Sequence, residues 1–361
     1  MTDLLDFVSL SLLPPWCWRV AAEWLRKGDA SATVSRRLVA ACAHGAAADS
    51  ADVRSIAADA IRRGSARSIA AIPWSAPSYP IALTTIADPP PVLWTRGRLD
   101  SLSAPAVAIV GSRAASPYGL AVAGQLAADL AARGVVIVSG LARGVDSAAH
   151  RGALSAGGAT VAVLGSGVDV VYPPEHASLA GDIDAAGAVI SELVPGTRPL
   201  QWFFPLRNRI ISGLSRAVVV IEANEKSGSL ITARCALDQG RDVLAVPGNI
   251  LTGRNRGAHA LLRDGAKIVE SADDILEELG LTTPAGIAGG ESGDGRRAAS
   301  DALADPILGS LVPGEASGLD EIAERSGLET PRLLPRLFEL ELQGLVRRVG
   351  GGRFVRIDRT C

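Results

Sequence analysis

The sequence predicts an α/β fold, in which a doubly wound parallel sheet is flanked by a small helical domain and a winged-helix domain. Three observations predict it. Short apolar segments alternate with helical stretches over residues 105–280, helical spacing dominates residues 1–71, and residues 306–361 show three helices followed by a hairpin. A chain of 361 residues with 48% apolar composition has room for two or three such domains.

The first segment, residues 1–71, shows apolar side chains at helical spacing, for example between Trp16 and Trp24, with breaks at Pro14-Pro15 and Lys27-Gly28-Asp29. This pattern predicts a compact set of short helices. Residues 72–104 are rich in proline and carry little periodicity. We expect them to form an extended connector that lies on the next domain and belongs to it.

The central segment contains six short apolar runs, each followed by glycine, serine or proline and then by a helical stretch. The runs are Ala106–Val110, Val135–Val138, Thr160–Leu164, Ala188–Ser191, Ala217–Ile221 and Val243–Val246. Continuous apolar strands that alternate with helices indicate a parallel sheet covered on both faces. Ligands of such folds bind beyond the carboxyl ends of the strands, so the loops there are the candidate site.

The C-terminal part begins with residues 281–305, whose Gly, Ala, Ser and Asp content predicts a flexible linker. Residues 306–361 then give the winged-helix pattern. Residues 281–361 hold 10 basic and 12 acidic side chains, so their charge fits protein binding at least as well as binding of duplex DNA.

Charge and cysteine content exclude several classes of protein. The net charge is −2, and residues 105–280 hold 15 basic against 17 acidic residues, so nucleic-acid binding would require local clustering. The four cysteines, Cys17, Cys42, Cys235 and Cys361, form no CxxC pair, which argues against a zinc ribbon and favours a reducing compartment. Early acids and the lack of a long apolar run predict a cytoplasmic protein without membrane segments.

A local cluster of this kind lies between Leu193 and Ile221, where four arginines occur without an acid. They are Arg198, Arg207, Arg209 and Arg216. Trp202, Phe203 and Phe204 stand beside them, and such a combination suits single-stranded nucleic acid, because arginines pair phosphates and rings stack on bases. Adjacent residues face different ways, so one ring of Phe203 and Phe204 is expected in the core. We expect Pro205 to hold Phe204 extended and its ring free.

The loops after the strands supply further candidates. In Gly111-Ser112-Arg113, the glycine lets a ligand approach the backbone closely, and the guanidinium of the arginine can bind a phosphate through two N–H groups. The second loop contributes Ser139, Gly140 and Arg143. The run Ser227-Gly228-Ser229, with Thr232, opens a helix and predicts an anion site.

The sequence supports an enzyme less than it supports nucleic-acid binding. Gly111 lacks the spacing of a dinucleotide fingerprint, and Ser139 stands where a ribose-binding acid belongs. Asp146, His150 and Asp169 are the candidate catalytic residues, and helix capping with a structural histidine explains the first two. The serines of the Ser227 loop have no base nearby in sequence. We therefore predict no catalytic residue, no cofactor and no metal.

With these residues in view, the chain resembles the DNA-processing protein A family (DprA, also called Smf). The resemblance runs from about Pro73 to Leu279. It rests on ordered matches at Tyr79-Pro80, Gly111 to Arg113, Ser139 to Asp146, Leu164 to Asp169, Phe204-Pro205, Arg207 to Ser215, Ser227 to Ala233 and Val246 to Gly248. The terminal domains match as a helical, sterile-alpha-motif-like (SAM-like) domain and a winged helix. Gln201 stands where members of the family often have a basic residue.

The resemblance implies an extended Rossmann-like domain that binds single-stranded DNA, dimerises, and delivers the DNA to the RecA recombinase during natural transformation. It would place Arg113, Phe204, Arg207, Asn208 and Arg209 at the DNA. For the dimer surface the segment Ala260–Val269 is a candidate, through Leu261, Leu262 and Ile268. Core packing of the two leucines is the equal alternative. Two alternatives stay open: a nucleotide-hydrolysing enzyme of the lysine-decarboxylase-like Rossmann group, and a sensor that binds a small nucleotide.

Overall fold

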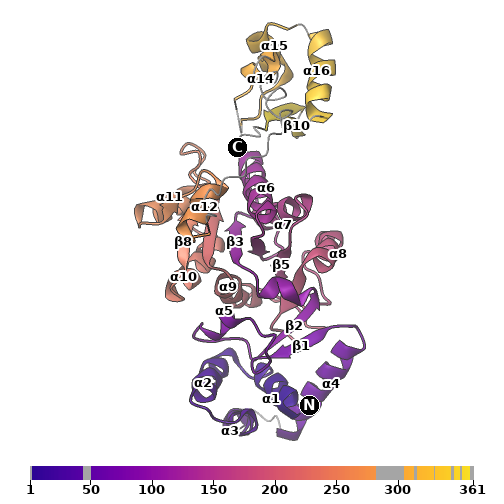
Figure 1. Ribbon diagram of the computed structural model, residues 1–361, viewed down its shortest axis with the longest axis vertical. Helices are drawn as coiled ribbons and strands as arrows, with labels where there is room; N and C mark the ends of the chain where they lie inside the picture. The colour runs from indigo at the N-terminus through magenta and orange to yellow at the C-terminus, as the bar shows by residue number, and fades with distance from the viewer. Residues whose placement is uncertain are drawn as a thin grey trace, which may run out of the picture. The chain divides into compact units, whose positions relative to one another are not determined.

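The computed structural model describes residues 2–43, 50–281, 305–312, 315–328, 330–342, 345–349 and 352–357. By their internal contacts these fall chiefly into two units: the helical and sheet domains together, and the C-terminal domain. Figure 1 traces the elements of each from the indigo N-terminus to the yellow C-terminus. The linker predicted at 281–305 lies almost wholly outside the described residues.

Four helices form the first domain, as the sequence predicts. They are α1 (Thr2–Ser11), α2 (Pro15–Arg26), α3 (Ser31–Ala43) and α4 (Ser50–Ser65). Pro15 opens α2, where its missing N–H has no partner to lose, and Gly28 follows the helix with φ of 92°. Their core continues into Val92 and Trp94 of the sheet, so the helices rest on one end of it.

The sheet has nine strands in the order β1-β2-β6-β5-β4-β3-β7-β8-β9. Their bounds are β1 (Ala70–Pro73), β2 (Val92–Gly97), β3 (Ala106–Gly111), β4 (Val136–Ser139), β5 (Thr160–Val163), β6 (Ala188–Ser191), β7 (Ala217–Ile221), β8 (Asp242–Ala245) and β9 (Lys267–Ile268). All six predicted strands are present within one residue at each end, and they are mutually parallel.

The prediction of a connector at 72–104 is wrong in part. The segment contains β2, which pairs antiparallel with β6 and with β1, so the sheet is mixed at this edge. It also contains the short helix α5 (Ile81–Thr84) and the 3₁₀ turn η1 (Leu99–Leu102). The sequence did not predict this strand for two reasons: prolines precede it, and its apolar run Val92-Leu93-Trp94 is only three residues long.

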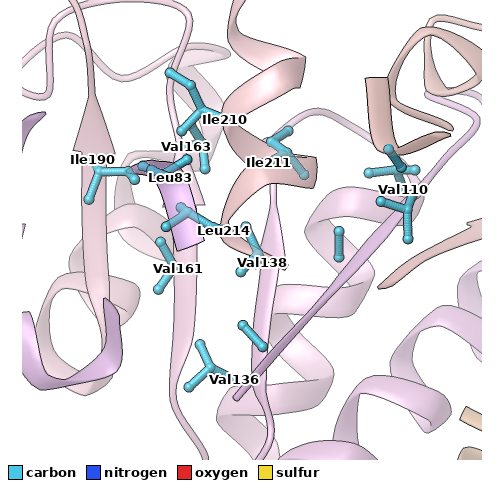
Figure 2. Close-up of a cluster of buried hydrophobic side chains, with 14 of the residues drawn as sticks. Leu83, Val110, Val136, Val138, Val161, Val163, Ile190, Ile210, Ile211 and Leu214 are labelled. Carbon is cyan, nitrogen blue, oxygen red and sulfur yellow. The ribbon is translucent and has the colours of Figure 1, made fainter. Parts of the chain in front are cut away.

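Both faces of the sheet are covered. In β3, Ala106, Ala108 and Val110 point into one core, whereas Val107 and Ile109 point into the other. Helices α5, α9 (Phe203–Leu214) and α10 (Ser229–Asp238) cover the first face, and α6 (Pro117–Ala132), α7 (Val145–Ser155) and α12 (Ala272–Glu278) cover the second. Figure 2 shows the first core, where Ile210, Ile211 and Leu214 of α9 lie over the strands. The remaining elements are η2 (Pro174–His176), α8 (Ala177–Ala186) and α11 (Arg256–Arg263).

The chain order places a topological switch beside β3. The strands β4, β5 and β6 follow one another on one side of it, whereas β7, β8 and β9 extend on the other. The loops after β3 and β7 therefore leave the sheet in opposite directions and open a crevice between them. Gly111 is required at this point, since a Cβ there would lie 1.8 Å from the carbonyl oxygen of Ile221.

The C-terminal domain is a winged helix, which confirms that prediction. Its elements are α14 (Pro306–Ser310), α15 (Leu319–Ser326), α16 (Thr330–Leu342), β10 (Val346–Val349) and β11 (Arg353–Arg356). The two strands pair antiparallel, and Ile322, Leu337 and Phe354 share one core. In the described parts of the whole chain, no helix combines the length and apolar character needed to span a membrane.

Candidate nucleic-acid interface

A cavity of about 680 Å³ lies at the carboxyl edge of the sheet, at the switch point. The loops after β3 and β7 and the first turns of α9 and α10 enclose it. Ten of the residues predicted from the sequence line it: Gly111, Ser112, Arg113, Phe204, Arg207, Asn208, Ser227, Gly228, Ser229 and Thr232. Segments more than 100 residues apart in the chain thus meet at one site.

The loop after β3 holds Arg113 at the mouth of the cavity. The amide of Ser112 donates to the carbonyl of Glu222 at 2.8 Å, and the carbonyl of Ser112 accepts from the amide of Val145 at 3.2 Å. The loop is thereby fixed on both sides. Arg113 is exposed and makes no ion pair with a described residue; its guanidinium carbon lies 5.6 Å from the ring centroid of Phe204.

The two phenylalanines divide as predicted. Phe203 is buried against the exposed Trp202, with ring centroids 3.8 Å apart, whereas Phe204 is half-buried and lines the cavity. The ring of Phe204 rests on Gly165, where a Cβ would lie 2.9 Å from its Cδ1. The ring of Tyr172 stands 5.6 Å away.

The expectation that Pro205 holds Phe204 extended is wrong, however. The residue lies in the first turn of α9 and is not extended. Pro205 is tolerated there because the first N–H groups of a helix have no partner within it. The position of the ring comes from the glycine beneath it.

Arg207 lies under the cavity with its charge buried. It is 4% exposed, and its Nη1 donates to the carbonyls of Gly140, at 2.9 Å, and Val163. Burial lowers the pKa of Arg207 to about 10, although the carboxylate of Asp146 opposes the shift. The residue contributes positive potential to the cavity, but turning its fork to a ligand would cost two carbonyl partners.

Arg209 does not reach the cavity, which corrects the expectation that it meets a phosphate. It is 5% exposed, donates to both carboxylate oxygens of Glu192 at 2.9 and 2.7 Å, and donates to Asp88 at 2.9 Å. Although burial opposes it, Glu192 and Asp88 raise the pKa of Arg209. The ring of Trp18 from α2 lies 5.3 Å from its guanidinium. Arg209 therefore joins the helical domain to the sheet.

The three residues predicted from the loop after β4 lie outside the cavity. Ser139 is fully buried and donates to the carbonyl of Ile109, and the amide of Gly140 donates to Asp146 at 3.1 Å. Arg143 is exposed and paired with Glu175. None of these three lines the cavity, so their predicted DNA contacts do not follow from this geometry.

The Ser227 loop closes the opposite wall at the N-terminus of α10. The hydroxyls of Ser227 and Ser229 lie 2.7 Å apart, and Asn208 of α9 donates to the carbonyl of Gly228 at 3.4 Å. Thr232 is almost wholly buried. A helix N-terminus presents N–H groups and positive potential, which suits an anion.

Among the lining residues that were not predicted as site residues, Lys226 and Tyr172 have side chains suited to a nucleic acid. Lys226 is exposed at the mouth and makes no ion pair with a described residue, and Tyr172 is 41% exposed. Lys226 could have been found, because it is one of three lysines and directly precedes Ser227. Tyr172 carries no comparable signal, since the fold alone brings it to Phe204.

The candidate catalytic residues make contacts within the fold. Asp146 is 7% exposed, its pKa is raised by burial, and it accepts from the amides of Gly140 and Ala142. His150 is fully buried beside Thr160, and burial lowers its pKa to about 3. Asp169 pairs with Arg67. No cluster of three or more His, Cys, Asp or Glu suited to a metal ion occurs among the described residues.

The candidate dimer residues differ in exposure. Leu261 is half-buried and packs against the first core, and Leu262 is also half-buried. Ile268 is 53% exposed on β9, the edge strand of the sheet. Ile268 is thus the surface-facing member of the three.

Comparisons with known proteins agree with this fold. The family model described as DNA recombination-mediator protein A matches residues 70–280, and that of the DprA winged helix domain matches residues 294–352. The chain is 42% identical to Protein Smf of Escherichia coli over 292 residues, covering 80% of this chain and 78% of that protein. It is 49% identical to DNA processing protein DprA of Streptococcus pneumoniae over 201 residues, covering 56% of this chain and 71% of that protein.

Solved structures show the same similarity. The structure of DNA processing protein A from Streptococcus pneumoniae superposes with a TM-score of 0.65 at 36% identity, covering 77% of this chain and 98% of that one. DNA processing protein A from Helicobacter pylori, described for its single-stranded DNA binding mode, superposes with a TM-score of 0.52 at 32% identity and covers 56% and 92%. The resemblance predicted from the sequence is confirmed: the chain belongs to the DNA recombination-mediator protein A family, which includes the DprA and Smf proteins.

Proposed function

We propose that this protein binds single-stranded DNA in the cavity at the carboxyl edge of the sheet. The observation that carries the proposal is the pairing of two exposed cations with two accessible rings around one opening. Arg113 and Lys226 can pair phosphates, while Phe204 and Tyr172 can stack on bases. The Helicobacter pylori relative, whose structure is described for its single-stranded DNA binding, supports the same assignment.

The cavity favours a strand over a duplex. Bases within a duplex are stacked on one another, so rings that line an opening stack only on bases that are unpaired. A positive helix N-terminus beside the rings suits the phosphate that follows the stacked base.

The proposed role is non-catalytic and lies in the cytoplasm, with the bound strand passed to the RecA recombinase during transformation. Asp146, the carboxylate that lines the cavity, already holds two loop amides, so the geometry gives the hydrolase alternative no added support. The recombinase step rests on membership of the family.

Self-association forms part of the proposal. One cavity makes few phosphate contacts and would bind weakly at physiological salt, whereas two cavities on one strand gain from effective concentration. Ile268 on the edge strand β9 is the candidate contact. Sedimentation at micromolar concentration should show a dimer for the wild type, and Ile268→Asp should shift it towards monomer. A strict monomer that still binds long oligomers tightly would remove the dimer from the account.

The test of the function is a titration with three labelled ligands: oligo-dT of about 20 nucleotides, a duplex of equal length and thymidine monophosphate. We expect the oligomer to bind at least tenfold more tightly than the duplex, with an affinity that falls steeply as salt rises. Thymidine monophosphate should compete only weakly. Competition by the mononucleotide at equal concentration would favour the nucleotide-sensor or hydrolase alternative.

A further inference from the structure

Two cysteines of the helical domain lie in direct contact. Cys17, in α2, and Cys42, in the last turn of α3, have their sulfur atoms 3.2 Å apart, although 25 positions separate them in the sequence. Both are free thiols. Cys235, the third free cysteine in the described part of the chain, belongs to α10 of the sheet domain.

We propose that Cys17 and Cys42 form a reversible oxidation site, in which a hydroperoxide such as hydrogen peroxide converts the two thiols to a disulfide. A disulfide bond is about 2.05 Å long, so the sulfurs must approach by roughly one ångström. Cys42 lies one residue before the end of α3, and the terminal turn of a helix moves at smaller cost than its middle.

The two thiols differ in access, and this sets the order of events. Cys17 is fully buried in the core of the domain, whereas Cys42 is half-buried. Peroxide therefore meets Cys42 first. The Cys42 thiol is oxidised to sulfenic acid, the peroxide is reduced, and one water is released. Cys17 then attacks the Cys42 sulfur, forms the S–S bond and expels a second water.

Proximity compensates for the weak nucleophile. Burial raises the pKa of Cys17 to about 12, and contact with Cys42 adds to the shift, so Cys17 is a thiol at neutral pH. Its sulfur nevertheless stands at the separation of roughly 3–3.5 Å from which reacting atoms start in well-oriented pairs. Disulfide formation should accordingly accelerate as the pH rises.

The bond would fix α2 to α3. Helix α2 also contacts the sheet domain. Its Arg26 donates to the carbonyls of Thr84 and Ile86 at 2.9 and 2.6 Å, and its Trp18 lies beside Arg209. Oxidation should thus stabilise the helical domain. The cavity residues are not part of this contact, so DNA affinity is expected to stay within twofold.

The experiment treats the reduced full-length protein with a small excess of hydrogen peroxide at pH 8, alkylates the remaining thiols and records intact and peptide masses. We expect a loss of two hydrogens and a linked pair of peptides containing Cys17 and Cys42. The midpoint temperature of thermal unfolding should rise on oxidation and return to its original value after reduction with dithiothreitol. Cys235→Ser is the matched control and should leave both the linked peptides and the rise in unfolding temperature unchanged. Cys42→Ser should abolish both.

A redox titration with glutathione tests the native geometry itself, without any variant. If the fold brings the sulfurs together, the equilibrium constant for forming the disulfide should be at least tenfold larger in the native protein than in urea, because a bond that fits the native state also stabilises it. An equal or smaller constant would overturn the proposal. So would sulfinic acid on Cys42 beside unmodified Cys17, or a disulfide to Cys235 or between chains.

Discussion

The loops at the mouth of the cavity and the buried face of α9 both carry arginine, yet they hold it in opposite states. Arg113 at the mouth is exposed and makes no ion pair with a described residue, while Arg209 on α9 is 5% exposed and paired with Glu192 and Asp88. A cation that already has two carboxylates offers little to a phosphate. The comparison teaches that two arginines near Phe204, one near it in space and one near it in sequence, can be held in opposite ways. Arg113 is left open to a ligand, as the proposal requires, whereas Arg209 supports the fold.

The largest expected effect is on stability, at Arg209. Arg209→Met removes the partner of a buried carboxylate and should lower the free energy of unfolding by about 3–5 kcal/mol. The protein that remains folded should bind oligo-dT as before. Urea unfolding and a titration below the transition measure the two quantities, and Arg216→Met is the matched control. Arg216 is exposed at the amino end of β7, so its replacement should change stability by less than about 0.5 kcal/mol.

The next effect is on binding, at Arg113. Arg113→Ala should weaken oligo-dT binding by about 1.5–3 kcal/mol, the cost of a lost charge-assisted hydrogen bond, and leave the midpoint of urea unfolding unchanged. The slope of log affinity against log salt should fall by about 0.7, since one phosphate contact is lost. If Arg209→Met lowers affinity and Arg113→Ala does not, the assignment of the two regions is reversed.

The two adjacent rings, Phe204 and Phe203, allow the same comparison between a residue at the cavity and a residue in the core. Phe204→Leu should cost roughly 1–3 kcal/mol of binding without changing the salt slope, because a stacked ring carries no charge. Its neighbour gives the control: Phe203→Leu should lower stability and spare affinity, as expected of a buried ring. A Phe204 variant that loses stability and keeps full affinity would place this ring in the core as well.

The smallest expected effect is at Lys226. Lys226→Ala should weaken binding by about 1 kcal/mol, because a single exposed ammonium at the mouth gives less than a two-pronged fork. Its salt slope should nevertheless fall by the same amount as that of Arg113→Ala. An unchanged slope would show that Lys226 stands beside the strand without touching it.

Much of the fold could be predicted because its signals are local. Runs such as Val135–Val138 and Ala217–Ile221 are apolar on both sides of the strand, which indicates a sheet buried on both faces. The edge strand β2 lacked this signal, since prolines surround it and its pairing with β6 joins residues about 95 positions apart. Nothing local specifies such a partner.

The site could be predicted at the level of loops but not of single side chains. Gly111 to Arg113 and Ser227 to Ser229 were found because small residues after a strand mark a crevice. The state of each arginine was hidden, because it depends on Glu192 and Asp88 for Arg209 and on the carbonyls of Gly140 and Val163 for Arg207. These partners are distant in sequence, so charge clustering overestimated the number of free cations.

Photocrosslinking tests the central claim most directly. Oligo-dT in which iodouracil replaces single thymines crosslinks to rings on which the base stacks, and peptide mapping identifies the residue. The account predicts crosslinks to Phe204 or Tyr172 in the wild type, reduced in Arg113→Ala and retained in Arg216→Ala. Crosslinks confined to the winged helix, residues 305–357, would contradict it.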